Sequence, residues 1–238
     1  MKKETEVNPY ESAAWSVPPT EEIKAGLKEL EGMLRKSLVL KLRSDAFGEA
    51  ESLFDARFDR DGGGVPRMAE ARAYVQRWTE MRRRGLGLLF WGPPGTGKTF
   101  AAAAIVNALC ERVESARMLT LSEALSSLSA LEPAARRYYY ASLRSCGLLV
   151  LDNFVMGRRS DYALDQILSI IDGRCQSKKP VIVTTNLSLG AMKHPGSMAE
   201  ERVFDRLLER CVPVCFDGES LRAARGRGNP ALFRSLTA

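Results

Sequence analysis

The stretch that decides the fold is WGPPGTGKTF, residues 91–100. It matches the pattern GxxxxGK[ST], in which a glycine-rich loop turns backbone N–H groups toward phosphate oxygens. The fixed positions of the pattern are filled by Gly92, Gly97, Lys98 and Thr99. An apolar run at 87–91 precedes the loop and a helix-forming run at 98–113 follows it. A loop between a strand and a helix is the setting that this motif requires, which favours a phosphate site over a chance glycine turn.

The motif assigns a role to each of its polar side chains. Its lysine reaches the β- and γ-phosphates of ATP, and the hydroxyl that follows binds Mg²⁺. We therefore expect Lys98 to face the phosphates and Thr99 to bind the metal, with the dipole of the helix N-terminus adding to the attraction. ATP and Mg²⁺ are the predicted cofactors. The predicted ATP-binding residues are Gly92, Pro93, Pro94, Gly95, Thr96, Gly97, Lys98, Thr99 and Phe100.

Apolar strands and amphipathic helices alternate around this loop. Strand alternating with helix is typical of an α/β fold with a parallel sheet and helices on both of its faces. The predicted strands are 87–91, 116–121, 147–152, 181–185 and 212–216. The predicted helices lie near 67–84, 98–113, 122–130, 133–145, 164–171 and 198–210.

The segment GLLVLDNF, residues 147–154, carries a carboxylate at the end of a buried strand. In an ATP-hydrolysing protein an apolar strand of this kind usually ends in two acids. We assign the first, Asp152, to the Mg²⁺ side of the site. The second position holds Asn153, an amide that orients water but accepts no proton. Loss of a positioned general base costs about 10²–10⁴ in rate. We expect a site that binds ATP, hydrolyses it slowly and acts mainly as a nucleotide-dependent assembly switch.

Two further groups of polar residues follow later strands. Asn186, in VIVTTNL, is placed to orient the attacking water or to read the γ-phosphate, or else it belongs to a plain strand-end turn. Arg202 and Arg206 are four apart on one predicted helical face, and Arg222 ends the segment FDGESLR. By composition alone, these arginines are interpreted as a solvated basic face.

The N-terminal part of the chain has a different pattern. Residues 1–19 lack periodicity and are interpreted as a flexible leader. From Thr20, the predicted helix N-cap, apolar residues recur every three or four positions, which predicts an amphipathic helix. The stripe consists of Ile23, Leu27, Leu30, Leu34 and Leu38. The breaker cluster DRDGGGVP at 59–66 is the predicted boundary between a helical N-terminal region, 1–65, and an ATP-binding domain, 66–238.

Composition narrows the class of protein. The chain of 238 residues has a formal net charge of +6, which permits an acidic polymer as a partner. No apolar run is long enough to span a membrane, and the first residues lack the apolar core of a signal peptide. Five cysteines without a CxxC pair suit buried thiols in a reducing cytosol, so a cytoplasmic protein is expected. The single histidine, His194, has no companion with which to hold a metal.

A second contact surface is suggested by EPAARRYYYASLRSC, residues 132–146. Arginines interleaved with tyrosines hold phosphates and stack bases of single-stranded DNA. Alternatively, the tyrosines pack the helix onto the sheet and the arginines are solvated, and a mixture of the two is expected. The candidate DNA-binding residues are Arg136, Arg137, Tyr138 and Arg144.

The order of these motifs resembles the AAA+ ATPases of the DnaC/DnaI helicase-loader family, which also includes the IstB transposition helpers. The resemblance implies that Asn186 is sensor 1, that Arg206 is an arginine finger given to a neighbouring subunit, and that Arg222 is sensor 2. Arg202 matches the other arginine of that helix. It also implies a five-stranded parallel sheet, a minimal or absent C-terminal lid, and a central channel lined by the element at 133–145. The segments that carry the resemblance are RAYVQRWTEMRRRGLGLLFWGPPGTGKTF, GLLVLDNF, SDYALDQILSIIDGR, KKPVIVTTNLSLGAM and ERVFDRLLERCVPVCFDGESLR.

The function implied by the resemblance is ATP-dependent loading of a replicative DNA helicase onto single-stranded DNA. The protein would form a homo-oligomer in its ATP state, with residues 1–65 gripping the helicase. Two alternatives stay open. One is a transposition helper that binds duplex DNA and a transposase; the other is a nucleotide-gated switch with little hydrolysis, which Asn153 favours.

Overall fold

A computed structural model describes residues 20–156, 160–227, 233–235 and 237. The chain divides into two compact units, residues 1–38 and 39–238. The division falls before the predicted boundary at 65/66, because Phe47, Ala56 and Val65 are buried in the core of the larger unit. The leader expected at 1–19 lies outside the described residues.

The smaller unit contains the first part of helix α1, Glu21–Phe47. Thr20 caps it as predicted, because its Oγ1 accepts a hydrogen bond of 3.4 Å from the backbone N–H of Ile23. The predicted apolar stripe faces solvent, with Leu30 52% and Leu34 61% exposed. Among the helices that the structure describes, none is long and apolar enough to cross a membrane.

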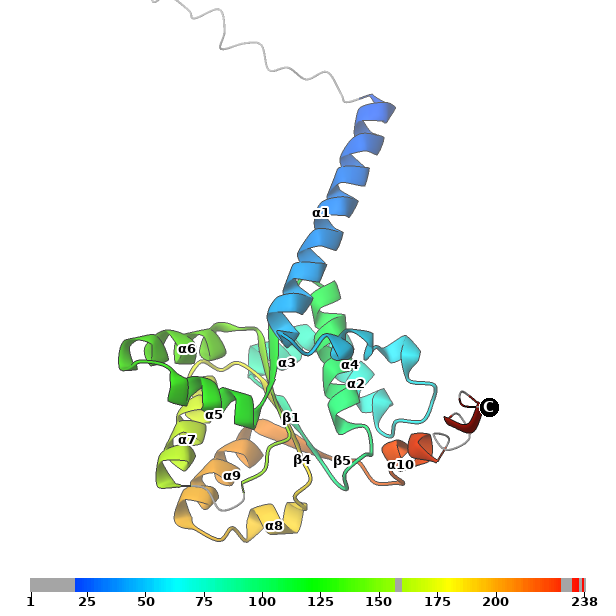
Figure 1. The fold of residues 1–238 in the computed structure, drawn as a ribbon. Helices are drawn as coiled ribbons and strands as arrows, with labels where there is room; N and C mark the ends of the chain where they lie inside the picture. The colour runs from blue at the N-terminus through cyan, green and yellow to red at the C-terminus, as the bar shows by residue number, and fades with distance from the viewer. Residues whose placement is uncertain (1–19, 157–159, 228–232, 236, 238) are drawn as a thin grey trace, which may run out of the picture. The chain divides into compact units, whose positions relative to one another are not determined.

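The larger unit is built on a five-stranded sheet in which every pair of neighbouring strands is parallel. The strands are β1 Gly87–Trp91, β2 Ala116–Thr120, β3 Leu148–Asp152, β4 Val181–Thr185 and β5 Cys211–Cys215. Their order across the sheet is β2-β3-β4-β1-β5. Figure 1 shows helices on both sides of these strands. The predicted α/β fold with a five-stranded parallel sheet is confirmed.

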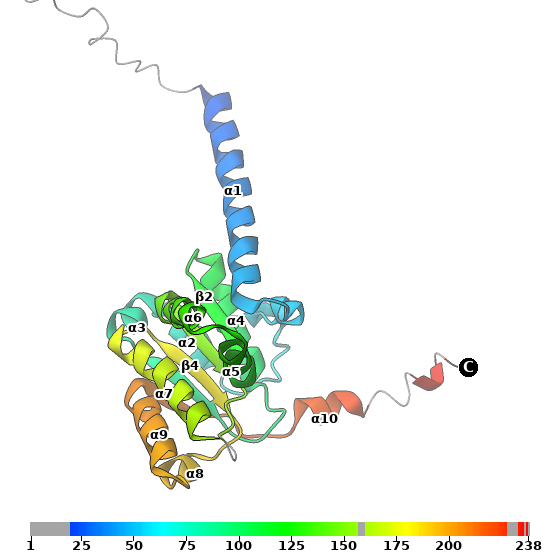
Figure 2. The same cartoon turned by 60° about the vertical axis from the view of Figure 1, so that its left-hand side comes forward.

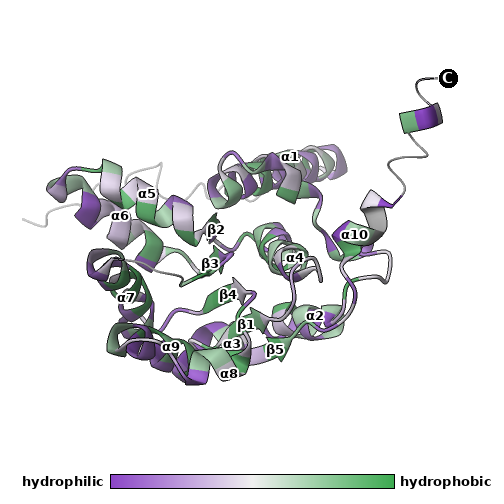
Figure 3. Ribbon diagram, turned by 60° about the horizontal axis from the view of Figure 1, so that its bottom comes forward, coloured by the Kyte–Doolittle hydropathy of each residue, from purple (hydrophilic) through white to green (hydrophobic). Residues whose placement is uncertain are grey.

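Side chains of successive strand residues alternate between two cores, one on each face of the sheet. Leu88 and Phe90 pack on one face with α2, Met68–Gln76, and α4, Lys98–Glu111. Leu89 packs on the other face with α7, Asp161–Gln176, and α9, Met198–Arg210. Figures 2 and 3 show α4 and α7 on opposite sides of the sheet. The helices of the two faces are α2 Met68–Gln76, α4 Lys98–Glu111, α5 Leu121–Ala130, α6 Pro133–Ser145, α7 Asp161–Gln176 and α9 Met198–Arg210.

Several short elements have no counterpart in the sequence prediction. The helix expected at 67–84 is interrupted at Arg77, so that α3 follows α2 as a separate helix. Short helices of three to six residues carry too little periodicity to be read from the sequence. Helix α3, Trp78–Arg84, is the second part of the helix predicted at 67–84. The elements without a counterpart are η1 Glu51–Asp55, η2 Phe58–Arg60, α8 Leu189–Lys193 and α10 Leu221–Gly226.

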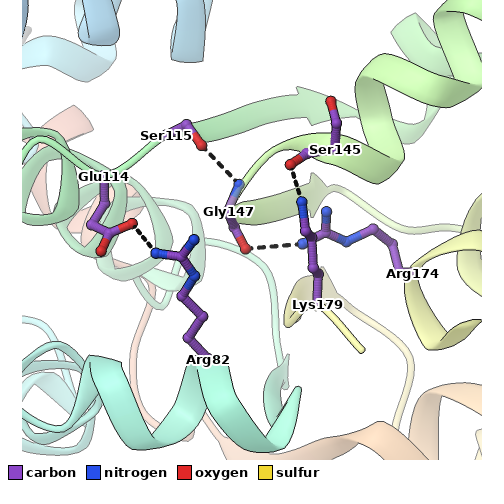
Figure 4. A network of polar contacts seen from close by, with 7 residues as sticks. All are labelled: Arg82, Glu114, Ser115, Ser145, Gly147, Arg174 and Lys179. Carbon is purple, nitrogen blue, oxygen red and sulfur yellow. Dashed lines mark hydrogen bonds and ion pairs between the residues drawn. The ribbon is translucent and has the colours of Figure 1, made fainter. Parts of the chain in front are cut away.

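A buried arginine ties α6 to the amino-terminal ends of the central strands. Arg174 of α7 is 1% exposed, and its guanidinium donates hydrogen bonds to backbone carbonyls rather than to a carboxylate. Burial lowers the pKa of this guanidinium. Figure 4 shows it beside Gly147, where Lys179 also donates to the carbonyl of Ser145. The five accepting carbonyls belong to Leu143, Arg144, Cys146, Gly147 and Pro180.

Candidate functional site

A cavity of about 580 Å³ opens at the carboxyl end of the sheet. The strand order explains its position, because β4 lies between β1 and β3 and the loops after all three strands meet at one edge. Predicted site residues from four separate segments line the cavity. They are Pro94, Gly95, Gly97, Lys98, Thr99, Phe100, Asp152, Asn153, Asn186 and Arg222.

The glycine-rich loop needs glycine because its backbone is left-handed and closely packed. Gly92 has φ 135°, and a Cβ added there would lie 2.3 Å from the carbonyl oxygen of Phe216. Gly97 has φ 95°, and a Cβ there would lie 2.6 Å from Cγ1 of Val65. Glycine alone adopts such a conformation without strain and leaves room for the neighbouring chain. The loop shape therefore depends on segments far away in sequence, at 65 and 216.

Lys98 begins α4 and is 7% exposed. Its Nζ donates to the carbonyl oxygens of Gly92, at 2.8 Å, and Pro93, at 2.6 Å. Burial lowers the pKa of this ammonium, Asp152 opposes the shift, and Arg222 adds to it. An ammonium has three N–H donors, so one remains for an anionic ligand. The loop thus holds a largely desolvated cation at the amino end of a helix, where phosphate is favoured.

Asp152 receives hydroxyl donors from two directions. Its Oδ1 accepts from Thr99 Oγ1 at 2.9 Å and from Thr184 Oγ1 at 2.6 Å. Thr184 in turn accepts from the backbone N–H of Asn153 at 3.0 Å, so this threonine links the ends of β3 and β4. Carboxylate and hydroxyl oxygens are ligands that suit Mg²⁺, and Thr99 and Asp152 present them side by side. The sequence analysis did not identify Thr184. The signal that could have found it is its place one residue before the end of β4, beside the predicted site.

Asn153 lies directly after β3 with φ 51°, in the left-handed region. Asn and Asp occupy this region more readily than other residues with a Cβ, so the backbone itself favours a short polar side chain here. Asn153 is exposed and lines the cavity. Asn186, directly after β4, is also exposed and lines it.

The two predicted arginines at the site lie in different places. Arg222 lines the cavity, and its helix is joined to the loop because the N–H of Leu221 donates to the carbonyl of Gly95 at 3.0 Å. Arg206 is on α9, outside the cavity lining, and forms ion pairs with Asp172 at 3.3 Å and Glu209 at 3.1 Å. Glu209 and then Asp172 raise the pKa of this guanidinium.

The helix that carries Arg206 is amphipathic, as the sequence analysis expected. Val203 and Leu207 are buried, while Arg202 and Arg206 are exposed. Arg202 and Arg206 therefore lie on the side of α9 that faces away from the sheet. Within one protomer, the cavity and Arg206 do not share a site.

The cavity has one wall that the sequence analysis missed. It is formed by the segment around η1, together with Val65 and Leu221. No motif marks these residues, because the wall exists only where the chain before the P-loop folds back beside it. The lining residues of this segment are Ser52, Leu53, Asp55 and Ala56.

The candidate DNA-binding residues on α6 divide into two groups. Arg136 is half-buried and already has partners, since it donates to the carbonyl of Leu131 and to the hydroxyl of Tyr162, both at 2.8 Å. Arg137, Tyr138 and Arg144 are exposed. Arg137 and Arg144 line a groove of about 470 Å³ between α6 and α7.

This arrangement defines a class of protein. A P-loop after β1, a carboxylate at the end of β3 and a polar residue after the intervening β4 are the parts of an AAA+ ATP-binding domain. The chain belongs to the family described as IstB-like ATP binding protein, which matches residues 35–228.

Individual relatives agree with that assignment. The replicative helicase loader DnaC of Escherichia coli is 30% identical over 165 residues, which is 68% of this chain and 65% of that protein. A putative ATP-binding protein in an insertion sequence of Mycobacterium tuberculosis is 29% identical over 217 residues, 87% of this chain and 83% of the relative. The chain thus spans slightly less than two thirds of the DnaC relative.

Solved structures show the same fold. A crystal structure of the DnaC helicase loader has a TM-score of 0.56 and 25% identity, and the match covers 63% of this chain and 87% of that one. A crystal structure of DnaI has a TM-score of 0.61 at 18% identity, with coverage of 71% and 95%.

Proposed function

We propose that this protein is an ATP-dependent loader or remodeller of a replicative DNA helicase on single-stranded DNA. The observation that carries the proposal is the separation of Arg206 from the cavity. That cavity is lined by Lys98, Asp152, Asn153, Asn186 and Arg222. An arginine that belongs to an ATP site but lies outside its own protomer's cavity acts on a neighbouring subunit. A replicative helicase is proposed as the partner because the similar protein DnaC is a replicative helicase loader.

In the proposed ATP complex, each lining residue has a distinct task. Lys98 faces the β- and γ-phosphates, and Arg222 meets the same charge from the side of α10. Thr99 and Asp152 would hold Mg²⁺, which when bound neutralises phosphate charge. Asn186 orients the attacking water. Asn153 positions water by a hydrogen bond without removing its proton, so hydrolysis is slow and the bound nucleotide serves as an assembly signal.

Arg206 supplies the proposed contact between subunits. On joining a neighbour, its guanidinium would exchange Asp172 and Glu209 for a γ-phosphate. Exposed ion pairs of this kind contribute little, whereas arginine fingers in other NTPases are worth about 10³–10⁵ in rate. The protein is therefore proposed to form a homo-oligomer when ATP is bound.

Partner binding is proposed for the N-terminal region, residues 1–65. Its described helix exposes Ile23, Leu27, Leu30 and Leu34 along one stripe. An apolar stripe on a helix normally packs against another apolar surface, and here a helicase would supply that surface.

Single-stranded DNA is proposed to lie along α6, at the groove that Arg137 and Arg144 line. Both guanidiniums are available for phosphates, and the exposed ring of Tyr138, 77% accessible, is available for base stacking. Arg136 instead supports the helix through Leu131 and Tyr162.

A second candidate function is that of a transposition helper acting with a transposase on duplex DNA. The insertion-sequence relative favours it, because that match covers 87% of this chain whereas the DnaC match covers 68%. A nucleotide-gated switch without useful turnover is the third candidate, and Asn153 favours it.

The test is capture of the helicase by the full chain carrying an affinity tag. We expect ATP-dependent capture of the host's ring helicase, and loading of that helicase onto single-stranded DNA circles. Leu30→Glu with Leu34→Glu should abolish capture, while Lys36→Glu, on the opposite side of the helix at about 100° per residue, should not. Capture of a transposase instead of the helicase would favour the transposition helper and refute the loader.

A further inference from the structure

We infer that Asn107 is a positioning residue for the nucleobase, because its carboxamide fixes the wall of the nucleotide cavity formed by residues 52–56. This inference rests on the proposed nucleotide complex and extends it from the phosphates to the base. Asn107 lies in the third turn of α4, the same helix that begins with Lys98. It does not line the cavity itself, so it acts through the wall and not on the ligand.

The contacts of Asn107 are well defined. The side chain is 1% exposed, and its Nδ2 donates to the carbonyl oxygen of Leu53 at 2.9 Å and of Ala56 at 2.8 Å. These carbonyls lie at the carboxyl end of η1, where a helix leaves its last acceptors without partners. Leu53 also accepts from the N–H of Ala56 at 3.1 Å. One carboxamide therefore closes the end of η1 and attaches it to α4.

The chemistry of the position requires an amide donor. Oδ1 of Asn107 is buried and has no hydrogen-bond partner among the residues that the structure describes. A buried polar atom without a partner is unfavourable, and a leucine of similar size would avoid it. This chain has an asparagine here nonetheless. Leucine would lack the two N–H donors that Nδ2 of Asn107 directs at the carbonyls of Leu53 and Ala56.

The wall has the character of a base site. Leu53, Ala56, Val65 and Leu221 offer aliphatic surface to the cavity, while Ser52 and Asp55 offer polar groups beside it. A nucleobase has flat apolar faces and a polar edge, and it suits a surface of this mixed kind. The ligand class is therefore a nucleoside triphosphate, whose phosphates lie at the P-loop and whose base lies against the 52–56 wall.

Helix α4 sets the distance between these two ends. From Lys98 to Asn107 the helix advances nine residues, about 13 Å at 1.5 Å per residue. Its residues Ala101–Ala104 are fully buried against the sheet, which makes α4 a rigid spacer. One helix therefore sets the spacing between the P-loop and the wall formed by residues 52–56.

The experiment compares ATP with inorganic tripolyphosphate, which has the phosphates without the base. We would measure both dissociation constants by calorimetry, with Mg²⁺, for the wild type and Asn107→Leu. Cys110→Ala is the matched control, because Cys110 is a fully buried residue of the same helix and lies outside the cavity lining. If Asn107→Leu does not fold, Asn107→Ser takes its place, since a shorter hydroxyl cannot bridge both carbonyls.

We expect Asn107→Leu to bind ATP about tenfold more weakly, the loss typical of one buried group left unpaired, and tripolyphosphate unchanged within about twofold. Cys110→Ala should change neither constant by more than about twofold. Equal weakening of ATP and tripolyphosphate would overturn the inference, because Asn107 would then support the P-loop itself. Unchanged ATP binding would also overturn it. Absence of ATP binding by the wild type would instead refute the proposed function, on which the inference rests.

Discussion

Replacing Asn153 by Asp restores a carboxylate at the position where the proposed mechanism lacks one. A positioned general base contributes about 10²–10⁴ in rate, which sets the upper limit of the gain in kcat. Nucleotide affinity should change little, because Lys98, Thr99 and Asp152 supply the phosphate and metal contacts. The new carboxylate lies next to Asp152, so part of the gain is lost to repulsion unless Mg²⁺ is bound.

The backbone at this position separates Asp from Glu. Asn153 has φ 51°, which Asp accepts readily, whereas a longer side chain in this region costs about 1–2 kcal/mol. For a chain of this size, that cost corresponds to a fall in melting temperature of about 2–8 °C. Asn153→Glu should therefore raise turnover at the expense of stability, and Asn153→Asp should raise turnover alone.

The assay is phosphate release under saturating ATP and Mg²⁺, with and without single-stranded DNA, alongside thermal unfolding. Asn153→Gly is the matched control, since glycine keeps the left-handed backbone and supplies no side chain. The explanation of Asn153 would be refuted if both acidic variants fold, bind ATP and turn it over at the wild-type rate.

Four further substitutions test other parts of the site and fold. Lys98→Ala should abolish ATP binding in calorimetry, because it removes the cation inside the loop, and tight binding would show that the loop is not the site. Arg206→Ala should leave ATP binding by a protomer intact but prevent ATP-dependent assembly in sedimentation; mixing it with Lys98→Ala should restore some turnover, and weakened ATP binding by the monomer would contradict a finger acting in trans. Arg137→Ala with Arg144→Ala should reduce the log–log salt slope of single-stranded DNA binding by roughly 0.7 per lost contact, and an unchanged slope would assign both residues to a solvated face. Arg174→Met should lower stability by several kcal/mol, since each orphaned buried carbonyl costs about 1–3 kcal/mol, and an unchanged melting temperature would contradict this bracing role.

The sequence by itself determined the features that depend on short stretches of chain. The P-loop was readable because its glycines and Lys98 lie within ten residues, and β3 was readable because an uninterrupted apolar run leads into Asp152. The fold class followed from the alternation of such runs with amphipathic helices. The pattern at 201–211 likewise placed Arg202 and Arg206 on one face of a helix, and both are exposed.

Only the tertiary structure decided which distant residues meet. Thr184 joins Asp152 because β4 pairs with β3. Residues 52–56 line the cavity, and two of their carbonyls accept hydrogen bonds from Asn107 of α4. The left-handed backbone of Asn153 was equally hidden, since a turn after a strand has no periodicity. These features rest on contacts between segments far apart in sequence, and such contacts form only when the buried faces of the sheet bring those segments together.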